Sequence, residues 1–217
     1  MSATKKIQGN LKSLILTFGK LLQSWENDCG EVERILTELH KLLQLMAAIK
    51  RTLSSRKSRF EFLAVFPALE SRLLAKISRD TEDLFRQIKL FWKRLGDVKV
   101  AMEKIASDSL RLIIGETPEA VQGGQDVFNS DHVLDVQDIQ TNYSLEYDRK
   151  EKLLGKLFRE SQPTGITVDP RFVGQESTYE LGNEKLMSEF LSLWSDNASV
   201  SFVDHERVET FRLINNL

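Results

Sequence analysis

The first 53 residues carry a hydrophobic repeat that leaves few choices of fold. Its spacing alternates between four and three residues, which is the heptad spacing of helices that pack side by side. A continuous helix of roughly 47 residues would be about 70 Å long, because each residue adds about 1.5 Å. Gly30 is the one position where it could bend or break, since glycine weakens a helix interior, and the sequence leaves open whether the helix continues through it. The repeat comprises Ile7, Leu11, Leu14, Phe18, Leu21, Trp25, Cys29, Val32, Leu36, Leu39, Leu43, Met46, Ile49 and Leu53.

Two later stretches are predicted to form further long helices. Pro67 suits the first turn of the second one, because that turn makes no use of the N–H that proline lacks. Ser130 or Asp131 is expected to cap the third. Glycines and a proline between residues 115 and 124 separate the two. We predict helices over about residues 5–53, 67–114 and 131–160. The seam of the second helix comprises Leu84, Ile88, Phe91, Leu95, Val98, Met102, Ile105, Ser109 and Leu112.

The C-terminal quarter has a different character. Residues 161–177 are rich in Pro, Gly and Ser, and we predict a linker between a long-helix bundle at 1–160 and a tail at 178–217. The tail sequences "NEKLMSEFLSLW" and "VDHERVETFRLI" predict two short helices, which must dock on the long helices or on another chain. The sequence thus predicts an all-α fold: an elongated antiparallel bundle of three long coiled-coil-like helices with a short helical C-terminal tail.

Charge and composition argue against several classes of partner. The 217 residues hold 30 Lys and Arg against 32 Asp and Glu, a net charge of -2. No overall field therefore draws the chain to nucleic acid, and we do not expect direct nucleic-acid binding. No apolar run approaches about 18 residues, so we expect no membrane span. With one cysteine and no apolar leader, we expect a reducing compartment, cytoplasmic and nuclear.

Residues that could carry chemistry are scattered. His40, His132 and His205 stand apart from one another, outside any metal-ligand spacing. The chain has no phosphate-binding loop and no dinucleotide fingerprint. Cys29 lies within the apolar repeat, where a small hydrophobic residue is expected. We predict no metal, no cofactor and no catalytic residue, and hence a protein that is not an enzyme.

Aromatic residues on the third helix suggest a binding face instead. Tyr143 and Tyr147 are four residues apart, so they share a helical face. We expect their rings to pack against a neighbouring helix while their hydroxyl groups reach polar atoms at its edge. Arg149 to Lys152 are expected to be mainly solvated. The predicted partner-binding residues on this face and on the tail are Ile139, Tyr143, Tyr147, Leu154, Phe190 and Trp194.

A basic cluster follows the first helix. It could bind phosphate or act as a nuclear-import signal, or it could be a solvated connection between helices. Serines interrupt the helical pattern here, which disfavours a continuous DNA-binding basic helix. The cluster comprises Lys50, Arg51, Arg56, Lys57 and Arg59.

Two stretches resemble the AIRIM family, small helical ribosome-maturation factors associated with an AAA ATPase. "LLQSWENDCGEVERILTEL" is similar to the first helix of that family, and the likeness covers most of residues 7–160. Gly30 and the glycine-rich loop after Ile114 depart from its pattern. In "AVFPALESRLLAKIS" the matching residues are Phe66, Pro67, Leu69, Arg72, Leu73 and Lys76; in "VQDIQTNYSLEYDRKEKLL" they are Gln137, Asp138, Ile139, Tyr143, Tyr147, Leu153 and Leu154.

A second resemblance is to the family of the cyclin-dependent-kinase-interacting protein, CINP, in "LGDVKVAMEKIAS" and "FLSLWSDN". The F-P-x-L-x-x-R-L motif favours the AIRIM family. These resemblances imply a non-catalytic adaptor subunit that pairs with a CINP-like helical subunit and docks on an AAA ATPase hexamer. That complex releases recycling factors from precursors of the large ribosomal subunit and is linked to chromatin and replication proteostasis.

The heptad pattern by itself leaves an alternative open. Long heptad helices also build structural coiled-coil subunits of cytoskeletal or kinetochore assemblies. Association with ribosome precursors, rather than with filaments or centromeres, would separate the two functions.

Overall fold

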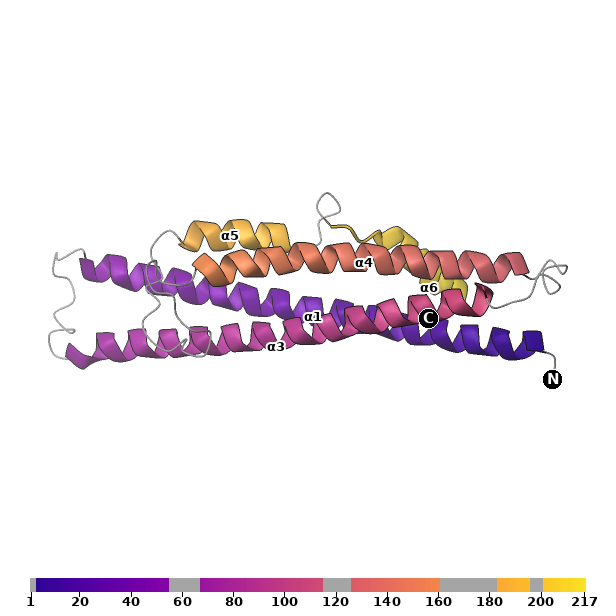
Figure 1. Cartoon of the computed structure of the whole chain (residues 1–217). Helices are drawn as coiled ribbons and strands as arrows, with labels where there is room; N and C mark the ends of the chain where they lie inside the picture. The colour runs from indigo at the N-terminus through magenta and orange to yellow at the C-terminus, as the bar shows by residue number, and fades with distance from the viewer. Residues whose placement is uncertain (1–2, 55–66, 115–125, 161–182, 196–200) are drawn as a thin grey trace. The chain divides into compact units, whose positions relative to one another are not determined.

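The computed structural model describes residues 3–54, 67–114, 126–160, 183–195 and 201–217. These residues form helices α1 (Ala3–Ser54), α3 (Pro67–Ile114), α4 (Asp126–Glu160), α5 (Asn183–Trp194) and α6 (His205–Asn215), shown in Figure 1. Within these described ranges there is no strand. The predicted all-α class, with three long helices that pack together, is confirmed.

The helix boundaries follow the sequence signals closely, with one difference. α1 continues through Gly30, so the possible break does not occur. A Cβ atom at this position would meet nothing within 4 Å. α3 has the predicted bounds. α4 begins at Asp126, five residues before the predicted start at 131. Ser130 and Asp131 therefore lie inside the helix rather than at its cap, because residues 126–130 contain no glycine or proline to stop it.

The chain forms two compact units. Unit 1 contains Met1–Gly30, Trp92–Lys150 and Asp196–Leu217, and unit 2 contains Glu31–Phe91 and Glu151–Ser195. The long helices α1, α3 and α4 each contribute a segment to both units. Of the two tail helices, α5 belongs to unit 2 and α6 to unit 1. The predicted linker at 161–177 lies outside the described residues.

In unit 1, α3 and α4 run antiparallel. Trp92, near the start of the α3 segment, stacks on Tyr147, and the carbonyl of Ala106, further along, accepts a hydrogen bond of 2.6 Å from Gln137. As residue numbers rise along α3, those of the neighbouring α4 residues fall. α1 and α4 are parallel, because Trp25 lies against Tyr143 and, later along both helices, Cys29 contacts Lys150.

The buried face of α1 in unit 1 is wider than the predicted heptad seam. Ile15 and Leu22 are buried, at 6% and 0% exposure, although neither belongs to the predicted repeat. The segment contacts both α4 and α6, and a helix packed on two sides needs a broader apolar stripe than a two-helix seam does. The core of unit 1 includes Leu11, Ile15, Phe18, Leu22, Trp25, Leu95, Val98, Met102, Ile105, Val133, Val136, Ile139 and Tyr143.

Unit 2 has a mostly aliphatic core. On α5, Phe190 and Trp194 stack at a ring distance of 5.9 Å and an angle of 17°. Their rings are buried at 5% and 1% exposure, so this short helix is fixed to the rest of unit 2 by its aromatic face. The other core residues of unit 2 include Val32, Ile35, Leu36, Leu39, Leu43, Met46, Ile77, Leu84, Ile88, Leu154, Leu157 and Met187.

Candidate functional site

The predicted partner-binding residues lie mainly inside the chain. Ile139 and Tyr143 are 1% and 2% exposed in unit 1. Leu154, Phe190 and Trp194 are between 1% and 5% exposed in unit 2. Among the six, Tyr147 is the half-buried exception. A partner would reach the buried five only if the helices opened, so their role in partner binding remains a prediction.

The two tyrosines form an aromatic cluster with two tryptophans. The ring of Tyr143 meets that of Trp25 edge-on, at 5.3 Å and 80°. Tyr147 stacks on Trp92 at 4.3 Å and 20°, and the ammonium group of Lys99 lies 4.9 Å from the centre of the same ring. Each arrangement suits the charge distribution of aromatic rings. The prediction that both rings pack against neighbouring helices is confirmed.

A charged cluster is buried beside these rings, on the same helix. Glu146, Arg149 and Lys150 are at i, i+3 and i+4 on α4, so one turn brings their side chains together. Glu146 is 0% exposed and Lys150 is 1% exposed, which is rare for either residue type. Lys150 lies seven residues after Tyr143 and four before Leu154, on the face that packs into the core.

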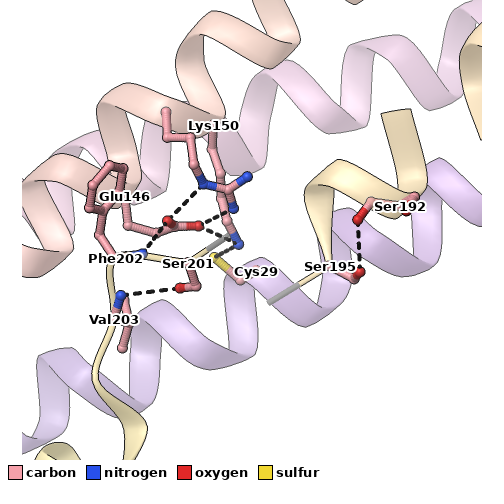
Figure 2. Close-up of polar contacts among 9 residues, drawn as sticks. Cys29, Glu146, Lys150, Ser192, Ser195, Ser201, Phe202 and Val203 are labelled. Carbon is pink, nitrogen blue, oxygen red and sulfur yellow. Dashed lines mark hydrogen bonds and ion pairs between the residues drawn. The ribbon is translucent and has the colours of Figure 1, made fainter. Parts of the chain in front are cut away.

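Glu146 is held by contacts from two sides. Its Oε2 accepts a hydrogen bond of 2.9 Å from Nε of Arg149, and its Oε1 lies 3.5 Å from Nζ of Lys150. The backbone N–H of Phe202 donates to Oε2 at 3.2 Å. Figure 2 shows this carboxylate at the centre of the group, with the segment before α6 approaching it. The charge is therefore paired and hydrogen-bonded, as a buried carboxylate requires.

Lys150 also reaches α1. Its Nζ donates to Sγ of Cys29 at 3.9 Å, and the Cys29 side chain is 6% exposed (Figure 2). Figure 2 also draws a local bond at the end of α5 in unit 2, where the hydroxyl of Ser195 donates to the carbonyl of Ser192 at 3.3 Å. In unit 1 the cluster thus joins α1, α4 and the residues before α6.

What this cluster does chemically follows from its burial. Removing one member of a buried ion pair leaves an uncompensated charge and costs about 3 to 5 kcal/mol, whereas an intact pair adds less to stability than an apolar pair of the same shape. A segment that carries one buried charge can pack stably only where the opposite charge is available to pair with it. We interpret the cluster as a device that fixes how α1, α4 and residues 201–204 fit together.

The expectation that Arg149 to Lys152 are mainly solvated is wrong for half of this run. The Arg149 side chain is 14% exposed and that of Lys150 1% exposed, while Glu151 and Lys152 are exposed. A basic run is normally solvated, which is why the sequence suggested it. The signal that could have found Lys150 is its heptad spacing from Tyr143, paired with an acidic residue one turn earlier.

A second pair of basic residues connects α6 to the long helices of unit 1. Arg207 contacts Asp135 at 2.9 Å and Asp138 at 2.8 Å, and Arg212 contacts Glu26 at 2.8 Å. The hydrogen bond that Arg207 donates to Asp135 is the main reason that the pKa of Arg207 is raised. Burial opposes the charge of Arg212, but the hydrogen bond and charge of Glu26 raise its pKa overall.

The sign of these shifts decides their effect on stability. A raised pKa in the folded state means that the stabilising contribution is complete below the ordinary pKa of arginine. It is lost only as the pH rises through the raised folded-state pKa. Neither arginine therefore makes the docking of α6 sensitive to pH near neutrality.

The predicted basic cluster is only partly within the described residues. Arg51 is exposed in the last turn of α1. The side chain of Lys50, and Arg56, Lys57 and Arg59 altogether, lie outside the described part of the chain. Phosphate binding and nuclear import by this cluster remain predictions.

Metal ligands do not converge in the described ranges. No group of three or more His, Cys, Asp or Glu side chains in that part of the chain is placed to hold a metal ion. His132 is buried at 7% exposure, while His205 is an exposed residue at the start of α6. As for membranes, none of the described helices combines the length and the apolar character that a span needs.

Unit 2 contains a groove between its segments of α1 and α3. Its volume is about 450 Å³, and its lining combines two leucines with acidic and other polar side chains. Glu38 already pairs with Arg34, and Asp83 with Arg86. The lining residues are Glu38, Lys41, Leu42, Asp80, Asp83, Leu84 and Gln87.

Comparison with known proteins adds no relative. No protein-family model matches this sequence, and no curated protein matches it significantly.

Proposed function

We propose that the protein is a non-catalytic adaptor subunit of an AAA ATPase complex in the maturation of the large ribosomal subunit, where it helps to release or recycle assembly factors. Its partners would be an AAA ATPase hexamer and a CINP-like helical subunit, with indirect association with ribosome precursors. The protein would act in the cytoplasm and the nucleus, and the proposal extends to chromatin and replication proteostasis. The sequence resemblance over residues 7–160 is its source.

The structural observation that supports an adaptor is the presence of large apolar side chains on the outer faces of helices. On α3, Leu69 and Leu73 are one turn apart and 45% and 40% exposed. On α6, Leu213 and Ile214 are 76% and 52% exposed. Single exposed leucines are common on any protein, but neighbouring ones on a helix face are typical of surfaces that meet another chain.

Leu69 and Leu73 are also part of the F-P-x-L-x-x-R-L motif, so we propose that the start of α3 contacts a partner. The predicted residues Ile139, Tyr143, Tyr147, Leu154, Phe190 and Trp194 would then support partner binding from within the units. In this proposal the exposed side chains contact the partner directly, and the buried side chains hold the helices in the positions that the contact requires.

Affinity purification tests the function. The tagged full-length protein would be isolated from its own cells at moderate salt, and the bound proteins identified by mass spectrometry. The proposal predicts an AAA ATPase and a second small helical subunit. Leu69→Glu with Leu73→Glu should lower their recovery, while Ala75→Glu with Arg79→Glu, also at exposed positions on α3, should not.

The structural coiled-coil function remains the second candidate. α1 and α3 span 52 and 48 residues, far beyond the usual helix of about 11 to 12 residues, and such lengths suit filament or centromere assemblies. Recovery of filament or centromere proteins without the ATPase would favour this candidate and contradict the adaptor proposal.

A further inference from the structure

Residues 201–217 form a segment that we call the C-terminal clasp, which lies on α1 and α4 within unit 1. The ring of Phe211 meets that of Phe18 edge-on, at 6.0 Å and 84°. Leu217 occupies the space left by the missing side chain of Gly19, where a Cβ atom would lie 2.6 Å from Cδ1 of the leucine. Apolar anchors thus fix the clasp at its C-terminal part, and Val203 and Val208, 7% and 2% exposed, add two more.

The edges of the contact are ionic and complementary. Arg207 lies between Asp135 and Asp138 of α4, and Arg212 pairs with Glu26 of α1. Each arginine is adjacent in sequence to an apolar anchor. The stretch Arg207 to Arg212, "RVETFR", therefore combines an arginine, two apolar anchors three residues apart, and a second arginine. This is the pattern of an amphipathic helix bound in an apolar groove with acidic edges.

Two features make the part of the clasp after residue 204 easier to detach than Phe202, whose backbone N–H donates to the buried carboxylate of Glu146. α6 has 11 residues, and isolated helices shorter than about 12 to 15 residues are marginal in water. The Arg207 side chain is 38% exposed, and ion pairs accessible to solvent contribute little. The surface beneath, in contrast, belongs to two long helices.

We propose that this surface of α1 and α4 binds an amphipathic helix of a partner protein with the pattern arginine, apolar, two variable residues, aromatic, arginine, and that the clasp occupies the site in the absence of the partner. The occupant is basic because Glu26, Asp135 and Asp138 provide the edges. Its aromatic residue takes the place of Phe211 against Phe18. Binding of such a helix does not depend on the proposed role in ribosome maturation.

A labelled synthetic peptide of residues 201–217 is the probe, and full-length protein is the receptor. In the variant Val208→Ser with Phe211→Ser, the clasp of the receptor is weakened and the site is open. In the wild type only the small fraction of molecules with a detached clasp can bind the peptide, and the apparent affinity for the peptide is reduced in proportion to that fraction. The peptide should therefore bind the variant at least about tenfold more tightly than the wild type. Equal affinity for both receptors, or no binding to either, would overturn the proposal.

Charge reversal gives the matched control. A peptide in which Arg207 and Arg212 are glutamate should bind the open variant about tenfold more weakly, and Asp135→Arg with Asp138→Arg in the receptor should restore part of that loss. If charge reversal has no effect, recognition is not by the acidic edges and the stated partner chemistry is wrong.

Hydrogen exchange of the unmodified protein provides a measurement that does not depend on the folding of any variant. The amides of α6 should exchange at least about tenfold faster than those of residues 11–29 of α1, since the clasp opens without global unfolding. Equal protection of the two would contradict a detachable clasp. Formation of dimers that exchange clasps between two copies would identify a second copy, not a partner protein, as the occupant.

Discussion

Units 1 and 2 are built from segments of the same three long helices, but the residues that fill their cores differ. Of the buried polar or charged residues in the described part of the chain, unit 2 contains Thr81, and unit 1 contains the rest. Unit 2 relies mainly on leucine, isoleucine and valine, with one aromatic pair, Phe190 and Trp194, on α5. In unit 1 an aromatic cluster and a buried carboxylate add contacts that have a required geometry. The buried residues of unit 1 in question are Asp28, Ser109, His132, Glu146 and Lys150.

The same long helices serve two purposes in the two units. Aliphatic side chains pack well in many arrangements, so they stabilise a bundle without dictating every contact. A buried charge tolerates only the arrangement that pairs it, which is how polar residues set register in other helical proteins. We therefore infer that unit 1 has the more strictly defined packing, and it is also the unit on which the C-terminal clasp is docked.

Replacing Glu146 with leucine should have the largest effect on stability. The change leaves the ammonium group of Lys150 and the backbone N–H of Phe202 without this acceptor inside unit 1. The expected loss in the free energy of unfolding is about 3 to 5 kcal/mol, measured by urea denaturation. In the control, Glu146→Leu combined with Lys150→Met should cost clearly less than the single change. Equal costs would show that the pair does not behave as a buried ion pair.

Leu39→Ala in unit 2 should have the next largest effect. Leu39 is fully buried, so the change removes apolar contacts and leaves a cavity, at a cost of about 3 kcal/mol. Leu39→Met, which roughly keeps the volume, should cost less than about 1.5 kcal/mol, because an aliphatic core adapts to such swaps. A methionine variant as unstable as the alanine variant would contradict the view that unit 2 packs permissively.

Replacing each of two helical glycines with alanine should have smaller effects on stability, and the two effects should differ. Gly30→Ala should stabilise the protein by about 0.5 to 1 kcal/mol, since α1 is helical there and the added methyl group meets nothing. Gly96→Ala should give no such gain, because its Cβ atom would lie 3.1 Å from the hydroxyl oxygen of Tyr147, a ring held by Trp92. Thermal unfolding of both variants would show the difference. An equal gain would mean that the aromatic cluster adjusts freely.

The smallest effect is expected for an exposed ion pair in unit 2. Arg86 pairs with Asp83, and their side chains are 74% and 50% exposed. Arg86→Ala should change the free energy of unfolding by less than about 0.5 kcal/mol, and the change should vanish at high salt. A larger loss that persists in salt would show that ionic contacts in unit 2 are as important as those in unit 1.

The long helices could be predicted from the sequence because their apolar spacing is a local property. The bounds of α3 follow from Pro67 and from the glycines after Ile114, whereas the continuity of α1 through Gly30 is visible only in the structure. The charged cluster could not be predicted in the same way, because whether Lys150 meets water depends on Cys29, more than a hundred residues away. The burial of Phe190 and Trp194 was likewise hidden, since an apolar face predicts burial without saying whether the chain itself or a partner covers it.

In unit 1 the buried carboxylate of Glu146 joins the long helices to the segment that begins the clasp. The most direct measurement is the hydrogen-exchange rate of the Phe202 amide, by NMR, in the wild type and in Glu146→Gln. We predict protection of this amide in the wild type and a marked loss of protection in the variant, because the neutral amide oxygen accepts a weaker hydrogen bond than the carboxylate. A Phe202 amide that exchanges freely in the wild type, or equally slowly in both proteins, would contradict the claim.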